Sequence, residues 1–113
     1  MKLFIGHFYP NLLNIYGYRG NIITLVKRCK WRNIEVEVVE INPGQKKTIK
    51  CDLYFGGGGQ DQQQDIVSKD FKKQSEFIKQ EIAKDKPFLA ICGTYQLLGK
   101  YFQTNTGAKI PGI

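Results

Sequence analysis

Cys92 is the residue of this chain whose neighbours are best suited to nucleophilic chemistry. It follows a short apolar run, residues 88–91, and Gly93 comes directly after it at the start of a predicted helix. A nucleophile at such a strand–turn–helix junction sits in a strained turn and needs small neighbours, which Ala90, Gly93 and Thr94 provide. The first N–H groups of a helix also stabilise a thiolate. Spacing alone leaves a second interpretation open, in which Cys92 is a small core residue at a strand end.

A loop of four consecutive glycines, residues 56–59, follows an earlier predicted strand. Such a run has a high cost in backbone entropy, so it indicates a tight turn or a close approach of the backbone to another group. Placed beside Cys92, a backbone N–H of this loop could stabilise the oxygen of a tetrahedral intermediate, a contribution of about 3 kcal/mol. A phosphate-binding loop is the weaker alternative, because no Gly-Lys-Ser/Thr sequence follows.

The elements that must position these two loops alternate between strand and helix along the chain. This alternation predicts an α/β fold of the flavodoxin-like, three-layer kind, a parallel sheet with helices on both faces. Both loops then lie at the carboxyl ends of neighbouring strands, where such sheets bind ligands. The predicted strands are residues 2–8, 34–41, 50–55 and 88–91. The first predicted helix is residues 20–33. The second has Phe71, Ser75, Ile78 and Ile82 on its core face. The third is residues 93–102, with Leu97, Leu98 and Tyr101 on its core face.

Composition is consistent with one modest domain of 113 residues with a formal net charge of +7. The basic residues are interspersed with acidic ones and cluster only at residues 27–32 and at Lys46-Lys47, so no nucleic-acid partner is expected. Three cysteines without a C-x-x-C pair suggest neither a disulfide framework nor a metal site. We expect no membrane span, because no apolar run approaches about 20 residues, and we expect a cytoplasmic protein without a signal peptide.

The residues around Cys92 are also similar to a known motif. Residues 90–99 (AICGTYQLLG) resemble the nucleophile motif of class I glutamine amidotransferases of the cobyric acid synthase type. Within this family the resemblance is closest to the glutaminase subunits that work with Mur-ligase-like synthetases on lipid II. Ala90 and Thr94 stand where the family often has Gly, and Tyr18 where Asp is common, so Thr94 is expected to crowd the turn slightly. Further similar segments are residues 13–16 with 20–22, residues 39–41, and residues 52–58 with Asp61 and Gln64.

The resemblance implies a role for each part of the site. Cys92 would attack the carboxamide of glutamine, release ammonia and leave a glutamyl thioester that water hydrolyses. The N–H of Gly93 and one from Gly57 or Gly58 would form the oxyanion hole, and Gln96 and Tyr95 would bind the substrate. Ammonia would pass to the synthetase, which would hold ATP and Mg²⁺ and amidate the D-glutamate of lipid II. No cofactor or metal is expected in this chain itself.

The resemblance also implies a base that these residues do not supply. The family uses a histidine far downstream of the cysteine, whereas His7 is the single histidine of this sequence. If the strand order is 2-1-3-4, one strand separates His7 from Cys92, about 10 Å across the sheet, whereas a base must lie about 3 Å from its nucleophile. We therefore expect residues 1–113 to form a partial amidotransferase domain that is inactive alone. Two alternatives remain open, an amidotransferase of cobalamin synthesis and a non-catalytic flavodoxin-like scaffold.

Overall fold

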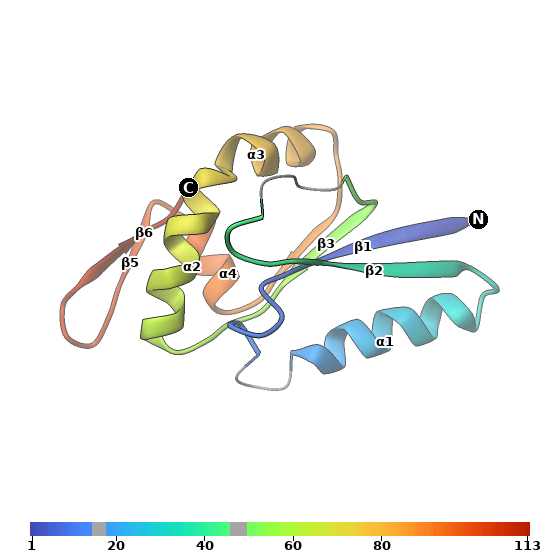
Figure 1. Ribbon diagram of the computed structural model, residues 1–113, viewed down its shortest axis with the longest axis horizontal. Helices are drawn as coiled ribbons and strands as arrows, with labels where there is room; N and C mark the ends of the chain where they lie inside the picture. Colours follow the sequence, from blue (N-terminus) through green and yellow to red (C-terminus); the bar gives the residue numbers. More distant parts are fainter. Residues whose placement is uncertain (15–17, 46–49) are drawn as a thin grey trace.

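The computed structural model describes residues 1–14, 18–45 and 50–113 (Figure 1). Residues 15–17 and 46–49 lie outside the described residues, and with them part of the family-like segment 13–22 and the Lys46-Lys47 pair. The main sheet has four parallel strands in the order β2-β1-β3-β4, the order assumed above in estimating the distance between His7 and Cys92. These strands are β1 (Lys2–Phe8), β2 (Glu35–Ile41), β3 (Leu53–Gly56) and β4 (Phe88–Ala90).

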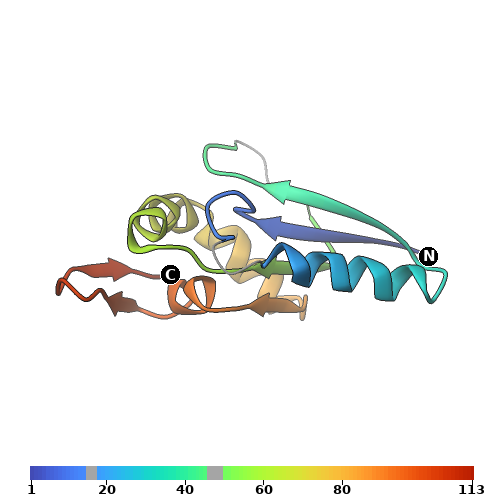
Figure 2. The same ribbon diagram turned by 90° about the horizontal axis from the view of Figure 1, so that it is seen from below.

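Helices cover both faces of this sheet, as the alternation of elements predicts (Figures 1 and 2). Side chains alternate in direction along a strand, so Phe8 and Tyr54 pack into one core with Phe71, whereas Ile5 and Phe55 pack into another. Helix α1 (Arg19–Lys30) covers the second core. The first core lies under α2 (Asp61–Lys73), α3 (Ser75–Ala83) and α4 (Gly93–Leu97). The three-layer arrangement brings the ends of β3 and β4 together beneath α2 and α4.

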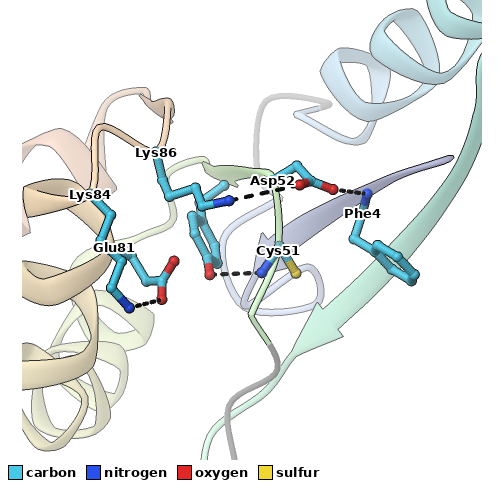
Figure 3. A network of polar contacts seen from close by, with 7 residues as sticks. Phe4, Cys51, Asp52, Glu81, Lys84 and Lys86 are labelled. Carbon is cyan, nitrogen blue, oxygen red and sulfur yellow. Dashed lines mark hydrogen bonds and ion pairs between the residues drawn. The ribbon is translucent and has the colours of Figure 1, made fainter. Parts of the chain in front are cut away.

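Strand β3 begins at Leu53, three residues later than predicted, because the Asp52 side chain takes the place of a regular strand pairing. Its Oδ2 atom accepts a hydrogen bond from the backbone N–H of Phe4 at 2.8 Å, while the Asp52 N–H donates to the Phe4 carbonyl at 2.8 Å. The Cys51 N–H donates to the Tyr54 hydroxyl at 2.9 Å, and Lys86 lies 3.8 Å from Asp52 (Figure 3). These contacts fix the start of β3 at the amino-terminal end of the strand, opposite the end where the glycine loop begins.

The single helix predicted through residues 71–82 is wrong, because the chain divides into α2 and α3 at Gln74. The buried Gln74 side chain donates to Asp70 Oδ2 at 2.7 Å, and its backbone leaves the helical conformation at φ −94° and ψ 6°. The apolar face shifts by one residue beyond this point. Ile78 stays buried, but Glu81 is 2% exposed and Ile82, predicted for the core, is 44% exposed.

The last predicted helix is also wrong in length, since α4 ends at Leu97 and a hairpin follows it. The hairpin pairs β5 (Tyr101–Gln103) with β6 (Lys109–Pro111) in antiparallel fashion. Tyr101, predicted for a helical core face, is 54% exposed on β5. The turn closes through Gly107 at φ +87°, a conformation that glycine adopts without strain. The hairpin is anchored to α2 by a hydrogen bond from Ser68 Oγ to the Pro111 carbonyl at 2.7 Å.

Asp70 joins α2 to the end of β1 and to the loop after β2. Its carboxylate accepts hydrogen bonds from the Tyr9 hydroxyl at 2.6 Å, from Gln74 Nε2 at 2.7 Å and from the Gly44 N–H at 3.0 Å. Burial alone would raise the pKa of Asp70. The three hydrogen bonds and the charge of Lys73 outweigh burial, so the pKa lies below its ordinary value.

Replacing Asp70 by Asn should lower the free energy of unfolding by about 1.5–3 kcal/mol at pH 7, because an amide NH₂ would face hydrogen-bond donors. Since the pKa of Asp70 is lowered in the folded state, its stabilisation is present above the unfolded pKa of about 3.9 and is lost as pH falls through the folded pKa. The difference between the two proteins should therefore shrink at pH 3, measured by urea unfolding at both pH values. Asp65→Asn is the control, because Asp65 forms an exposed ion pair with Lys69 and should cost less than about 1 kcal/mol. Equal effects of the two substitutions at pH 7 would contradict this role of Asp70.

Candidate active site

Cys92 lies in a strained turn between β4 and α4, which is called the elbow below. Its backbone angles are φ +53° and ψ −113°, in a region that side chains other than glycine rarely occupy. Cys92 is exposed, whereas Gly93 and Thr94 directly after it are buried. Such strain persists only where surrounding contacts enforce it, and it is concentrated at functional sites. The geometry predicted from small neighbours around the thiol is therefore present.

The glycine loop packs against this turn so closely that side chains are excluded. A Cβ atom added to Gly58 would lie 2.9 Å from both Cβ and Sγ of Cys92 and 3.0 Å from the Gly93 nitrogen. A Cβ atom on Gly57 would lie 2.6 Å from the ring of Tyr18. Distances below 3.0 Å between such atoms do not occur without a shift of the structure. Glycine is thus required at both positions by close approach.

Thr94 holds the two loops together. Its N–H donates to the Gly57 carbonyl at 3.0 Å, and its Oγ1 hydroxyl donates to the same oxygen at 2.7 Å. The side chain also fills the space beside Gly56, where an added Cβ atom would overlap it. Beyond the slight crowding expected from its size, Thr94 has a specific role in this turn. Its hydroxyl orients the Gly57–Gly58 peptide.

Two backbone N–H groups remain available beside the thiol. Neither the Gly58 nor the Gly93 N–H donates a backbone hydrogen bond within the described ranges. The Gly57–Gly58 peptide is fixed through the Gly57 carbonyl, and a planar trans peptide then also fixes the direction of the Gly58 N–H. Fixed N–H groups next to a nucleophile can stabilise an oxyanion without reorganising during the reaction.

A cleft of about 260 Å³ opens at Cys92. Several polar side chains lie in it, so it can accept a small polar substrate. Gln96, predicted to bind substrate, lines this cleft, but Tyr95 does not. Tyr95 is 72% exposed and lines a separate pocket between α4 and the hairpin. The lining residues of the cleft are Gly59, Asp61, Gln64, Cys92, Gln96, Phe102, Gln103, Thr104 and Asn105.

His7 lies away from the cleft. It is 3% exposed on β1, and its ring packs against Phe55 of β3 with the ring centroids 5.2 Å apart. Burial lowers its pKa to about 4, with an opposing effect of Glu40 and a further lowering by Arg19. The ring is therefore neutral at pH 7. Strand β3 separates it from β4, as expected for a structural histidine.

Gln64 was not among the site residues predicted from the sequence, although it belongs to a segment similar to the family. Its side chain is 2% exposed, lines the Cys92 cleft and packs on Gly93, where an added Cβ atom would overlap the amide. The sequence does carry one signal of this placement. Gln64 precedes Val67, Ser68 and Phe71 by three, four and seven residues, the spacing of one buried helical face.

Comparison with known proteins agrees with this geometry. Residues 4–113 match the family model of the CobB/CobQ-like glutamine amidotransferase domain. The chain therefore belongs to this family of glutamine amidotransferases, and its fold is the α/β, flavodoxin-like fold of such a domain.

Two named proteins are similar to almost all of this chain. One is the lipid II isoglutaminyl synthase (glutamine-hydrolyzing) subunit GatD of Staphylococcus aureus (strain N315), 43% identical over 113 residues, which are 99% of this chain and 46% of that protein. The subunit of the same name from Streptococcus pneumoniae (strain ATCC BAA-255 / R6) is 38% identical over 114 residues, 99% of this chain and 44% of that protein. The chain thus spans less than half the length of these relatives. None of the helices in the described part combines the length and apolar character of a membrane span.

The strain at Cys92 predicts an unusual order of stability among variants. Cys92→Gly should be more stable than Cys92→Ala by about 1 kcal/mol, because only glycine adopts a positive φ without strain. At Cys29, in the last turn of α1, the order should reverse by up to about 1 kcal/mol, since glycine is a poorer helix former than alanine. Chemical denaturation of the four variants measures both differences. A Cys92→Ala variant at least as stable as Cys92→Gly would show that the turn is unstrained.

The close approach of the glycine loop predicts loss of thiol reactivity in Gly58→Ala. The new methyl group would displace the thiol or the Gly93 amide, so we expect alkylation of Cys92 by iodoacetamide to slow at least about tenfold, equivalent to about 1.4 kcal/mol. Peptide mass spectrometry separates Cys92 from Cys29. Gly20→Ala is the control, because an added Cβ atom there meets no atom within 4 Å. Equal alkylation rates in the two variants would contradict the packing argument.

Proposed function

We propose that this chain carries the nucleophile and the oxyanion hole of a glutaminase that supplies ammonia to a synthetase. The observation that carries the proposal is the positive φ of Cys92 directly beside the fixed N–H groups of Gly58 and Gly93. The family match supports it, because glutamine amidotransferases take ammonia from glutamine. No disulfide joins cysteines in the described part of the chain, which is consistent with a reducing, cytoplasmic setting.

In the proposed reaction, the Cys92 thiolate adds to the carboxamide carbon of glutamine. The carbonyl oxygen becomes an oxyanion that accepts hydrogen bonds from the Gly93 and Gly58 N–H groups, each worth about 3 kcal/mol in the barrier. Collapse of this intermediate breaks the C–N bond, and the nitrogen takes a proton and leaves as ammonia. Water then hydrolyses the glutamyl thioester, so that glutamine and water give glutamate and ammonia.

The proton transfers require a base that lies outside residues 1–113. His7 is buried on β1 with β3 between it and Cys92, and it does not line the cleft. We propose a histidine from another part of the full-length protein as this base. Gln96 lines the cleft one turn after Cys92 and is proposed to bind the amino-acid end of the substrate. Tyr95 faces a different pocket, so a role in binding would require it to act from outside the cleft.

The proposed acceptor is the D-glutamate carboxyl of lipid II, amidated by a Mur-ligase-like partner that binds ATP and Mg²⁺. Two relatives named as subunits of lipid II isoglutaminyl synthase, at 43% and 38% identity, favour this acceptor over a cobalamin precursor. Their description as subunits also favours a partner chain.

The test is hydrolysis of glutamine by the full-length gene product together with its partner. Cys92→Ser should lower ammonia release by at least about 10³-fold, because the hydroxyl is a far weaker nucleophile than a thiolate. A diazo-ketone analogue of glutamine should alkylate Cys92 selectively. Cys29→Ser, on α1, should change neither readout. Ammonia release that persists in Cys92→Ser, or equal labelling of all three cysteines, would overturn the proposal and favour a non-catalytic scaffold.

A further inference from the structure

Gln64 presents a buried amide whose hydrogen-bonding groups have no protein partner. The residue is 2% exposed, yet neither Oε1 nor Nε2 makes a hydrogen bond to any described residue. Each buried polar atom left in this way costs about 1–3 kcal/mol. Such atoms are rare in folded proteins, and each one requires an explanation.

The position of this amide points to a ligand in the cleft. Gln64 lines the same cleft as Cys92, although it comes from α2 and not from the elbow. Its amide packs on the Cα atom of Gly93, the residue that follows the nucleophile. The unsatisfied groups therefore lie at the reacting end of the site, whereas Gln96 lies one turn further along α4.

The chemistry of the two atoms restricts the ligand group. Oε1 can only accept hydrogen bonds and Nε2 can only donate them, so a group that satisfies both must offer a donor and an acceptor side by side. A primary carboxamide does so. A carboxylate offers acceptors alone, and would leave Oε1 facing a negatively charged oxygen. Rotation of the amide by 180° exchanges the two atoms without changing this argument.

We propose that Gln64 pairs with the γ-carboxamide of glutamine and distinguishes it from the γ-carboxylate of glutamate. Its Oε1 accepts from the NH₂ group that leaves as ammonia, and its Nε2 donates to the carboxamide oxygen. This role rests on the proposed glutaminase function. It gives the site a means of releasing its product, because hydrolysis replaces the NH₂ donor by an oxygen that Gln64 Oε1 repels.

The test compares Gln64→Met with wild type in the full-length gene product and its partner. Methionine has a similar length but neither polar group, so we expect kcat/KM for glutamine to fall about 10- to 100-fold, the effect of leaving substrate groups unpaired. The ratio of the glutamate Ki to the glutamine KM should fall about tenfold. Alkylation of Cys92 by the diazo-ketone analogue, which has no carboxamide NH₂, should change less than about threefold.

Gln63→Met is the matched control, because Gln63 Oε1 is also buried without a partner among the described residues but faces another pocket, with Asn11, Leu12, Asn14 and Gln60. It should leave all three readouts unchanged. Gln64→Glu, with the same shape, is the second variant should Gln64→Met fail to fold, and it should also lower kcat/KM at least tenfold.

The outcomes separate this inference from the proposed function. Hydrolysis by Gln64→Met within threefold of wild type would overturn the inference and leave the glutaminase proposal standing. Parallel losses of hydrolysis and diazo-ketone labelling would also overturn it, since they would show that Gln64 only supports the elbow. Absence of glutamine hydrolysis in the wild-type complex would overturn both.

Discussion

The Gly57 carbonyl accepts two hydrogen bonds from Thr94, and the geometry of the whole site depends on this contact. The bonds join the loop after β3 to the first turn of α4. They fix the Gly57–Gly58 peptide, bring Gly58 against Cys92, and hold the thiol at a backbone conformation that costs about 1–3 kcal/mol. An isolated strand–helix junction would relax to negative φ. The neighbouring loop prevents this relaxation.

The sheet explains why these two loops meet. Parallel pairing of β3 with β4 places Gly56 opposite Ala90, so the loops that follow the two strands leave the sheet side by side at its carboxyl end. The Ile91 N–H still donates to the Gly56 carbonyl at 3.0 Å, and the strands therefore separate only at the next residue. At the opposite end, Asp52 and Phe4 align β3 with β1 (Figure 3). A shift of β3 by one residue would move Gly58 away from the thiol. It would also turn each side chain of β3 toward the core on the wrong face of the sheet.

The sequence predicts the sheet and the elbow, because both depend on local signals. Short apolar runs separated by helical patterns indicate parallel strands, and small residues around Cys92 indicate a sharp turn. The break at Gln74 depends instead on Tyr9, which lies 65 residues away in the chain. No periodicity within α2 and α3 reports that contact, so Ile82 was assigned to the wrong face. The β5–β6 hairpin was missed for another reason, since Thr104-Asn105-Thr106-Gly107 is a turn signal that a helical interpretation of residues 93–102 left unused.

Gln64 shows what sequence reasoning alone cannot reach at this site. Helical spacing can predict that the residue is buried, but a buried glutamine normally bonds to protein groups. That its Oε1 and Nε2 atoms lack partners among the described residues is seen only in the folded arrangement of α2, the glycine loop and the elbow. Gly93 allows this arrangement, because a Cβ atom there would overlap the amide. Glycine directly after Cys92 therefore leaves room for a neutral amide beside the thiol.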